Sequence, residues 1–453
     1  MTRQAPDTAT TFAVSDGYRK YVLFILFIIY GLSYVDRQIF FTLIEPIRKE
    51  FEFGDFQMGL LSGMAFAMFY ATLGIPIARF ADRHNRVNII SVSLVVWSAA
   101  TALTAKAMGF WHLFLARVSV GVGEAGCNPS AYSIISDYFP AKKRATAQSI
   151  YSLGVYLGQF IGFLTAGYVA QEYGWRTAFY VVGLPGLAVA IVAKLTLREP
   201  PRGFSEPAGF VLGEPPKLLY VLKKLFSLPA FRNLSVAAGL HALVAYGLQS
   251  YYSAFLMRVH GMSLAETSAA LAVITVTGGL TGTYLGGKLS DVLSQRRGGD
   301  PRYQMWVPAA ALLINIPAWL FALLLPSKYA SMALMIPSIA LGATYLGPSI
   351  AATHQLARVP ERAVSGAVLL FVLNFIGIGF GPMLTGAISD WLRDSYVSGG
   401  MELEAARALG LKYALCIMSL SNLWSAYHYF RAAKTLREDI ATGQAPVAVP
   451  VHG

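Results

Sequence analysis

The feature that most constrains this chain is a succession of apolar segments of about 20 residues, separated by short polar turns. A helix of ~20 residues is long enough to cross the hydrocarbon core of a bilayer, because each residue adds ~1.5 Å. Only 13% of the 453 residues are charged, whereas a soluble domain carries about 25%. The sequence therefore predicts an all-α polytopic membrane protein with twelve transmembrane helices. These fall at residues 19–43, 56–79, 87–106, 110–138, 145–171, 175–197, 232–257, 264–291, 304–325, 329–357, 364–391 and 410–431.

Lys and Arg residues fall mainly in alternate turns between these segments. Because positively charged turns remain in the cytoplasm, this asymmetry places both termini there, which requires an even number of spans. The formal net charge of +12 is then explained by topology, and no nucleic-acid partner is needed. The polar start of the chain lacks the short apolar core and cleavage site of a signal peptide. Compact loops suit a multi-pass protein of a bacterial inner, or plasma, membrane.

The one long polar interruption divides the chain into an N-terminal half (1–197), a cytoplasmic linker (198–231) and a C-terminal half with a cytoplasmic tail (232–453). The linker ends in a basic amphipathic stretch, typical either of a helix lying on the cytoplasmic leaflet or of a partly helical connection. The halves repeat, since YGLSYVDR at 30–37 aligns with YGLQSYYS at 246–253. Parallel six-helix repeats describe one transporter architecture, so we expect two pseudo-symmetric six-helix bundles.

Charged residues lie well inside two of the predicted spans: Asp36 and Arg37 in the first, and Arg117 and Glu124 in the fourth. A charge near the middle of a membrane costs at least ~2.5–3.5 kcal/mol, so it normally faces a bundle interior or a watery cavity. Burial disfavours the ionised carboxylate, which can then exchange protons near neutral pH. We interpret Asp36 and Glu124 as proton-coupling residues. Two alternatives remain: the Asp36–Arg37 pair extends to the interface, or Glu124 is a permanent partner of Arg37 or Arg117.

Arg37 and Arg117 are predicted to bind an anionic headgroup, because a guanidinium forms paired hydrogen bonds with phosphate or carboxylate. Arg117 suits equally a purely structural charge network. The second half supplies aromatic rather than charged surface, which suits the tail of an amphiphile. Further polar residues inside the spans are predicted to contact substrate, although a single His is more often structural: Asn128, His241, Gln249, Tyr252 and Asn374.

Several motifs carry a family resemblance. Residues 78–86 (ARFADRHNR) resemble the G-x-x-x-D-R-x-G-R signature of the major facilitator superfamily, although Ala78 and Asn85 replace its glycines. Residues 117–123 (RVSVGVG) are similar to its R-x-x-x-G-x-G pattern. Within that superfamily, three stretches resemble the spinster group of sphingolipid and lysophospholipid transporters: 34–38 (YVDRQ), 121–131 (GVGEAGCNPSA) and 137–147 (DYFPAKKRATA).

The resemblance implies the major facilitator fold and a secondary active transporter that works by alternating access on an anionic amphiphile. Organic-anion symporters share a similar Asp-Arg pair and a GEAG-like fourth span, so a small organic anion remains an alternative substrate. A multidrug exporter is a further alternative. The resemblance also implies a cytoplasmic gate of ion pairs that closes in the outward-open state: Asp82, Arg83, Arg86, Asp137, Arg144, Asp291, Glu361 and Arg362.

No part of the sequence resembles an enzyme site. The histidines are scattered without metal-ligand spacing, and no phosphate-binding loop for ATP occurs. We therefore expect no cofactor and no metal, and a monomer whose partners are an anionic lipid or small organic anion, protons and membrane lipids. A non-transporting receptor or scaffold is the competing class, but it would not need Asp36, Arg37 and Glu124 together in the membrane.

Overall fold

The computed structural model describes residues 14–205 and 218–444. In these two ranges the regular structure is helical and no strand occurs, which confirms the expected all-α class. Residues 206–217 of the predicted linker lie outside the described residues. The linker's final stretch forms helix α9 (Leu218–Ser227), whose Val221 and Leu225 are buried in the protein while Leu219 is exposed. The boundaries of the two predicted halves remain a prediction.

Before the linker, the chain forms a first set of helices that follow the predicted spans closely. They are α1 (Asp16–Thr42), α2 (Ile44–Phe51), α3 (Asp55–Gly59), η1 (Leu60–Met64), α4 (Ala65–Ala81), α5 (Arg86–Thr104), α6 (Phe110–Glu124), α7 (Cys127–Tyr138) and α8 (Ala141–Thr196). Helix α8 contains two predicted spans, and Gly174 separates them with φ of 81°. Side chains other than glycine avoid this left-handed region, so the chain bends there.

After α9, a second set of helices completes the described chain. They are α10 (Pro229–His260), α11 (Leu264–Arg296), α12 (Tyr303–Leu324), α13 (Lys328–Ala343), α14 (Leu346–Gln355), η2 (Val359–Glu361), α15 (Arg362–Leu373), η3 (Asn374–Phe380), α16 (Gly381–Ser398), α17 (Leu403–Leu420) and α18 (Asn422–Gln444). Within the described ranges, eight helical stretches are long and apolar enough to cross a membrane. One of them is the 55-residue stretch Lys142–Thr196, so the finding is consistent with twelve crossings.

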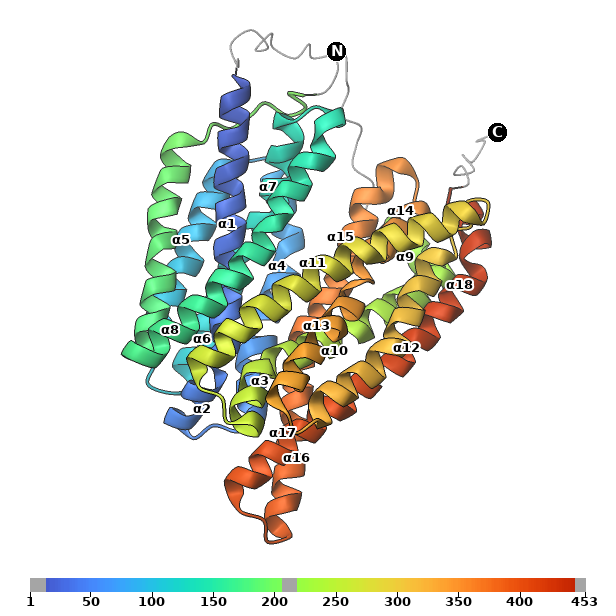
Figure 1. Ribbon diagram of the computed structural model, residues 1–453. Helices are drawn as coiled ribbons and strands as arrows, with labels where there is room; N and C mark the ends of the chain where they lie inside the picture. Colours follow the sequence, from blue (N-terminus) through green and yellow to red (C-terminus); the bar gives the residue numbers. More distant parts are fainter. Residues whose placement is uncertain (1–13, 206–217, 445–453) are drawn as a thin grey trace, which may run out of the picture.

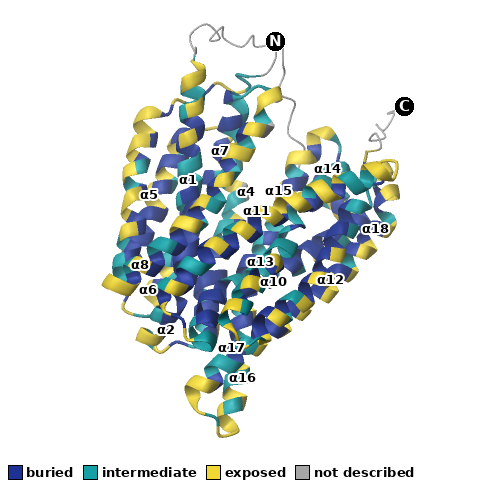
Figure 2. Ribbon diagram, viewed as in Figure 1, coloured by how far each residue is buried: buried dark blue, intermediate teal, exposed yellow. Residues whose placement is uncertain are grey.

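The two sets of helices stand side by side, with α1–α8 on the left of Figure 1 and α10–α18 on the right. The start of α1 and the end of α18 lie at the same end of the molecule, here called the terminal end. Helices α2 and α3 and the junction of α16 with α17 lie at the other end, here called the opposite end. Buried residues run through both sets, and exposed residues cover the outer helix faces (Figure 2).

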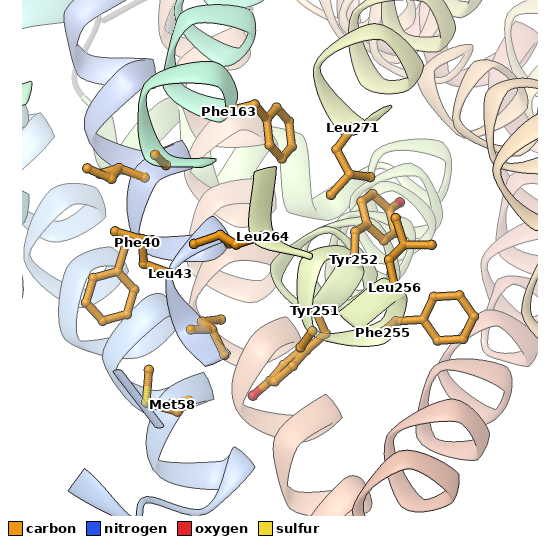
Figure 3. Packing of buried hydrophobic residues seen from close by; sticks show 14 of the residues in the cluster. Phe40, Leu43, Met58, Phe163, Tyr251, Tyr252, Phe255, Leu256, Leu264 and Leu271 are labelled. Carbon is orange, nitrogen blue, oxygen red and sulfur yellow. The ribbon is translucent and has the colours of Figure 1, made fainter. Parts of the chain in front are cut away.

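One hydrophobic cluster joins the two sets of helices. It includes Phe40 of α1 and Leu43 directly after that helix, together with Tyr251 and Phe255 of α10, all of them fully buried. Figure 3 shows these side chains with Leu264 of α11 in the space between the two sets. The apolar contacts therefore hold the two sets together around the ends of α1 and α10.

Glycines allow the two sets to approach closely at the opposite end. A Cβ atom at Gly59 of α3 would lie 2.3 Å from the carbonyl oxygen of Pro382 in α16. A Cβ atom at Gly386 of α16 would lie 2.2 Å from the carbonyl oxygen of Asp55. Only residues without a side chain permit these backbones to cross at such short range.

Candidate functional site

A cavity of about 240 Å³ lies between the two sets of helices. The first set contributes the cations Arg37 and Arg117 to its wall. The second set contributes the aromatic residues Tyr246, Tyr252 and Trp319. The positive charge of the wall therefore comes from the first set, while both sets contribute aromatic residues.

The charge on the first wall is centred on an ion pair between α1 and α6. Arg37 donates from Nε and Nη2 to the same carboxylate oxygen of Glu124, Oε2, over 2.9 and 2.6 Å. Arg37 is 8% exposed and Glu124 2%, so both are buried in the protein rather than extended towards its surface. A charge-assisted bond between buried groups is strong, and removing one partner leaves the other charge unpaired.

Aromatic rings surround the Arg37 guanidinium. Its central carbon lies 5.1, 4.7 and 4.6 Å from the ring centroids of Tyr34, Phe66 and Tyr70. Ring faces attract a cation, and this attraction strengthens when water is excluded. The surrounding rings thus help Arg37 to remain charged if its bond to Glu124 is broken.

Asp36 and Arg117 lie beside this ion pair. Arg117 donates from Nε to the Leu61 carbonyl over 3.4 Å, and its guanidinium carbon lies 4.7 Å from the Phe40 ring centroid. In the described ranges neither Asp36 nor Arg117 forms an ion pair, but both interact electrostatically with Glu124. Oδ1 of Asp36 is buried without a hydrogen-bond partner there. The two acids lie behind the lining, whereas the two arginines belong to it.

Three of the predicted substrate-binding residues of the second set also line the cavity: His241, Gln249 and Tyr252. The Tyr252 ring stacks on Trp319 with centroids 5.3 Å apart. His241 is 2% exposed, and both of its ring nitrogens lie within hydrogen-bond distance of an oxygen. The geometry therefore brings these three residues to the wall that faces Arg37.

Two other predicted residues are not part of the lining. Asn128 of α7 donates to the hydroxyl of Tyr70 over 3.2 Å and accepts from the Tyr151 hydroxyl over 2.7 Å. Asn374 begins the π-helical turn η3. In this conformation Asn128 holds aromatic residues together, and its predicted contact with substrate remains a prediction.

Arg86, one of the predicted gate residues, forms a buried cluster at the terminal end. It pairs with Asp137 of α7 and, from Nε over 2.6 Å, with Glu199 after α8. It also donates to the hydroxyl of Ser133 over 2.7 Å. All of these contacts stay on the α1–α8 side of the molecule.

On the other side, Glu361 accepts from Lys224 over 2.7 Å and also pairs with Arg358. Back in the first set, Arg144 of α8 donates to the Ser205 hydroxyl over 3.4 Å. Among the described residues no ion pair is shown for the remaining predicted gate residues: Asp82, Arg83, Asp291 and Arg362. Among the described residues no ion pair joins predicted gate residues of one half to those of the other, and the gate remains a prediction for another conformation.

The sequence analysis missed an ion-pair network at the opposite end. Arg258 of α10 donates to Asp55 of α3 over 2.8 and 2.7 Å and to Glu45 of α2 over 2.7 Å. Arg48 also pairs with Glu45, and Ser389 of α16 donates to Asp55 over 2.7 Å. Burial alone would raise the pKa of Glu45, but Arg258 and Arg48 outweigh it and hold the pKa below its usual range. An arginine near the end of a span, opposite two acids after the first span, was the available signal.

This network closes the opposite end. In the described ranges, Asp55 and its neighbour Phe56 form most of the hydrogen bonds between the two sets, with Arg258, Tyr251, Ser389 and Asp390 as partners. In the same ranges, the other hydrogen bonds between the sets join Glu45 to Arg258, Thr42 to Ser253, Gln171 to Ala265, and Tyr156 to Gly279 and Thr283. In this conformation the two sets of helices are therefore held together at the opposite end, beyond the cavity.

Comparison with known proteins agrees with this architecture. Residues 26–392 match the family model of the Major Facilitator Superfamily. The chain is 30% identical over 418 residues to an "MFS-type efflux pump" of Mycolicibacterium smegmatis, covering 92% of this chain and 93% of that relative. It is 27% identical over 408 residues to the "Sphingosine-1-phosphate transporter SPNS2" of Danio rerio, covering 85% and 78%.

A solved structure is similar over almost the whole chain. It is the crystal structure of a bacterial homolog to the human lysosomal transporter Spinster in an inward-facing and unoccupied conformation. The TM-score is 0.87 at 34% identity, and the match covers 96% of this chain and 100% of that one. The chain therefore belongs to the Major Facilitator Superfamily and is a spinster-like member of it.

Proposed function

We propose that this transporter moves an anionic amphiphile, such as a lysophospholipid or a sphingolipid-like molecule, by alternating access coupled to protons. The observation that carries the proposal is the composition of the cavity wall, with Arg37 and Arg117 on one side and Tyr252 and Trp319 on the other. A guanidinium binds phosphate through charge-assisted hydrogen bonds, and aromatic surface accommodates an acyl or alkyl chain. The similarity to a sphingosine-1-phosphate transporter supports the same class of substrate.

The proposed orientation places the terminal end in the cytoplasm, because Lys and Arg concentrate in the turns at that end. The Arg258 network then closes the extracytoplasmic end, and the conformation is inward-facing. Similarity to an inward-facing homolog supports this assignment. Alternation would open the Arg258 network and bring the terminal-end charges of the two halves, Arg86 and Glu361 among them, into contact across the interface.

Proton coupling would act through the acids behind the cavity. Protonation of Glu124 weakens its hold on Arg37, which becomes available to an anionic headgroup. Conversely, release of the headgroup returns Arg37 to an ionised Glu124. Asp36 lies within electrostatic reach of Glu124, so the charge of one acid affects the protonation of the other.

Uptake into proteoliposomes tests the substrate class. Labelled lysophospholipid, sphingosine phosphate and a panel of small dicarboxylic and sugar acids are compared with and without an imposed pH gradient. Gradient-dependent movement of the lipids alone supports the proposal. Movement of the small acids alone would overturn it in favour of the organic-anion symporter, for which the arginine pair is also suited. Export of uncharged drugs alone would favour the multidrug exporter, the class that the efflux-pump relative suggests.

A further inference from the structure

A chain of four hydrogen bonds crosses the cavity wall of the second set of helices. The Gly342 carbonyl of α13 lies 2.9 Å from Nε2 of His241 in α10, and Nδ1 of His241 lies 2.9 Å from Oδ1 of Asn422 in α18. Asn422 donates from Nδ2 to Oδ1 of Asn315 in α12 over 3.1 Å, and Asn315 donates to the Ser338 carbonyl of α13 over 2.5 Å. All five residues line the cavity.

The two ends of this chain are fixed acceptors, because Gly342 and Ser338 contribute backbone carbonyl oxygens. Each of the four contacts needs one hydrogen. An amide side chain that bridges two neighbours offers its NH₂ group to one and its oxygen to the other. A neutral imidazole likewise offers one N–H and one acceptor nitrogen. The three bridging side chains therefore supply three hydrogens for four contacts.

Turning the amide groups does not supply the missing fourth hydrogen. If Asn422 turns its NH₂ group towards His241, its oxygen faces the oxygen of Asn315. If Asn315 turns as well, its oxygen faces the Ser338 carbonyl. With neutral His241, every arrangement leaves two acceptors in contact. An imidazolium donates from both nitrogens and satisfies all four contacts.

We propose that His241 is a proton-binding site of the second set of helices, occupied while this chain of hydrogen bonds is closed and vacated when it opens. Proton binding would thus depend on the packing of α10, α12, α13 and α18 around the cavity. The proposal goes beyond the coupling acids Asp36 and Glu124, which lie in the first set.

The surroundings of His241 contain both opposing and favourable influences. Burial disfavours the imidazolium, since His241 is 2% exposed. Gly342 lies in the last turn of α13, where the carbonyl groups form the negative end of the helix dipole and favour a cation. Tyr345, between α13 and α14, has its ring centroid 4.6 Å from that of His241, and Tyr429 of α18 lies within electrostatic reach of Tyr345. The other titratable and charged groups that line the cavity with His241 are Tyr246, Tyr252, Tyr34, Tyr156, Arg37 and Arg117. In the described ranges no carboxylate contacts His241.

Helix α18, which contributes Asn422, also carries an internal control, His428. Its Nε2 accepts from the indole N–H of Trp424 over 3.0 Å, and its Nδ1 lies 2.9 Å from Oδ1 of Asn233. The amide of Asn233 is oriented by its donation to the Pro229 carbonyl over 2.9 Å. One donor and one acceptor face this imidazole, so the neutral form satisfies both contacts.

Nitrogen NMR of the full chain in nanodiscs, labelled with ¹⁵N-histidine, tests the proposal at about pH 7. The His241 signal, assigned by its loss in His241→Gln, should show both ring nitrogens protonated, while His428 should be a neutral tautomer. In Asn315→Ala the Asn422 amide is free to turn and donate to His241, so His241 should become neutral. A neutral His241 in the unsubstituted protein would overturn the proposal, and so would an imidazolium that persists in Asn315→Ala. If Asn315→Ala does not fold, the spectrum of the unsubstituted protein decides. The readout requires no transport, so its outcome is separate from that of the proposed function.

Discussion

Both hydrogen bonds that Arg37 donates to Glu124 end on Oε2, while Oε1 of Glu124 is buried with no hydrogen-bond partner in the described ranges. A proton can therefore add at Oε1 without first displacing the guanidinium. The neutral acid then holds Arg37 less strongly, because a charge-assisted bond is roughly twice as strong as a neutral one. This arrangement connects protonation of one residue to the freedom of the other to bind an anion.

Replacing Arg37 by Ala should lower transport of an anionic lipid at least about tenfold, since a hydrogen bond to a charged group contributes about 1.5–3 kcal/mol. The change also leaves Glu124 buried and unpaired, so the thermal midpoint should fall. The double variant Arg37→Ala/Glu124→Gln removes the unpaired charge and should recover stability without recovering transport. Lipid uptake and thermal unfolding, measured on the same preparations, separate the two effects. Undiminished uptake in Arg37→Ala would refute a role in binding.

Replacing Arg258 by Gln should shift the protein away from the inward-facing conformation. The variant leaves Asp55 and Glu45 buried without their shared cation, and breaking a buried ion pair costs about 3–5 kcal/mol. Single cysteines introduced at the closed end should then react faster with a membrane-impermeant reagent added from outside. The Arg407→Gln change at the same end, which removes the half-buried partner of the exposed Glu404, is the matched control and should leave this rate unaltered. Equal rates in both variants would mean that the network does not hold the end closed.

Acid should weaken the same closure. Burial by itself raises the pKa of Glu45, but Arg258 and Arg48 lower it further, so the net shift is downwards. The contribution of Glu45 is therefore complete above its ordinary pKa of about 4.3 and is lost as the pH falls through the lowered value. Cysteine reactivity at the closed end should rise in that acidic range, and Glu45→Gln should reduce this rise. A pH profile that Glu45→Gln leaves unchanged would assign the effect to another group.

Replacing Gly59 by Ala should also open this end. The added Cβ would lie 2.3 Å from the Pro382 carbonyl oxygen, and relieving such an overlap costs about 1–3 kcal/mol. Gly74→Ala is the control, because a Cβ atom there meets nothing within 4 Å. Distances between spin labels on α3 and α16 should lengthen in the first variant and stay constant in the second. No lengthening in Gly59→Ala would show that the backbones can adjust without separating.

Hydropathy and motif spacing were sufficient to predict the all-α membrane fold and the family. The predicted break between residues 171 and 175 coincides with Gly174, because the local chain itself carries the signal. The sequence also suggested that Glu124 and Arg37 are partners, since unpaired charges inside spans are costly.

Other features depend on contacts that no local pattern records. Arg258 meets Asp55 and Glu45 only because α10 packs beside α2 and α3, and charged residues near turns are also explained by topology. Asn315 and Asn422 are single amides in apolar spans, and their link to His241 needs three helices to converge. The predicted cytoplasmic gate stays a prediction, because the same charges can pair within one half or between halves.

The most direct test of the central proposal is proton-driven lipid uptake in proteoliposomes, comparing the unsubstituted protein with Glu124→Gln. The exposed Glu404→Gln change serves as the matched control. A pH gradient in one of the two directions should drive uptake in the unsubstituted protein and in Glu404→Gln. Glu124→Gln, which cannot exchange a proton, should lose the response to the gradient while still exchanging lipid down a concentration difference. Uptake that responds equally to the gradient in all three proteins would contradict proton coupling through the Arg37–Glu124 pair.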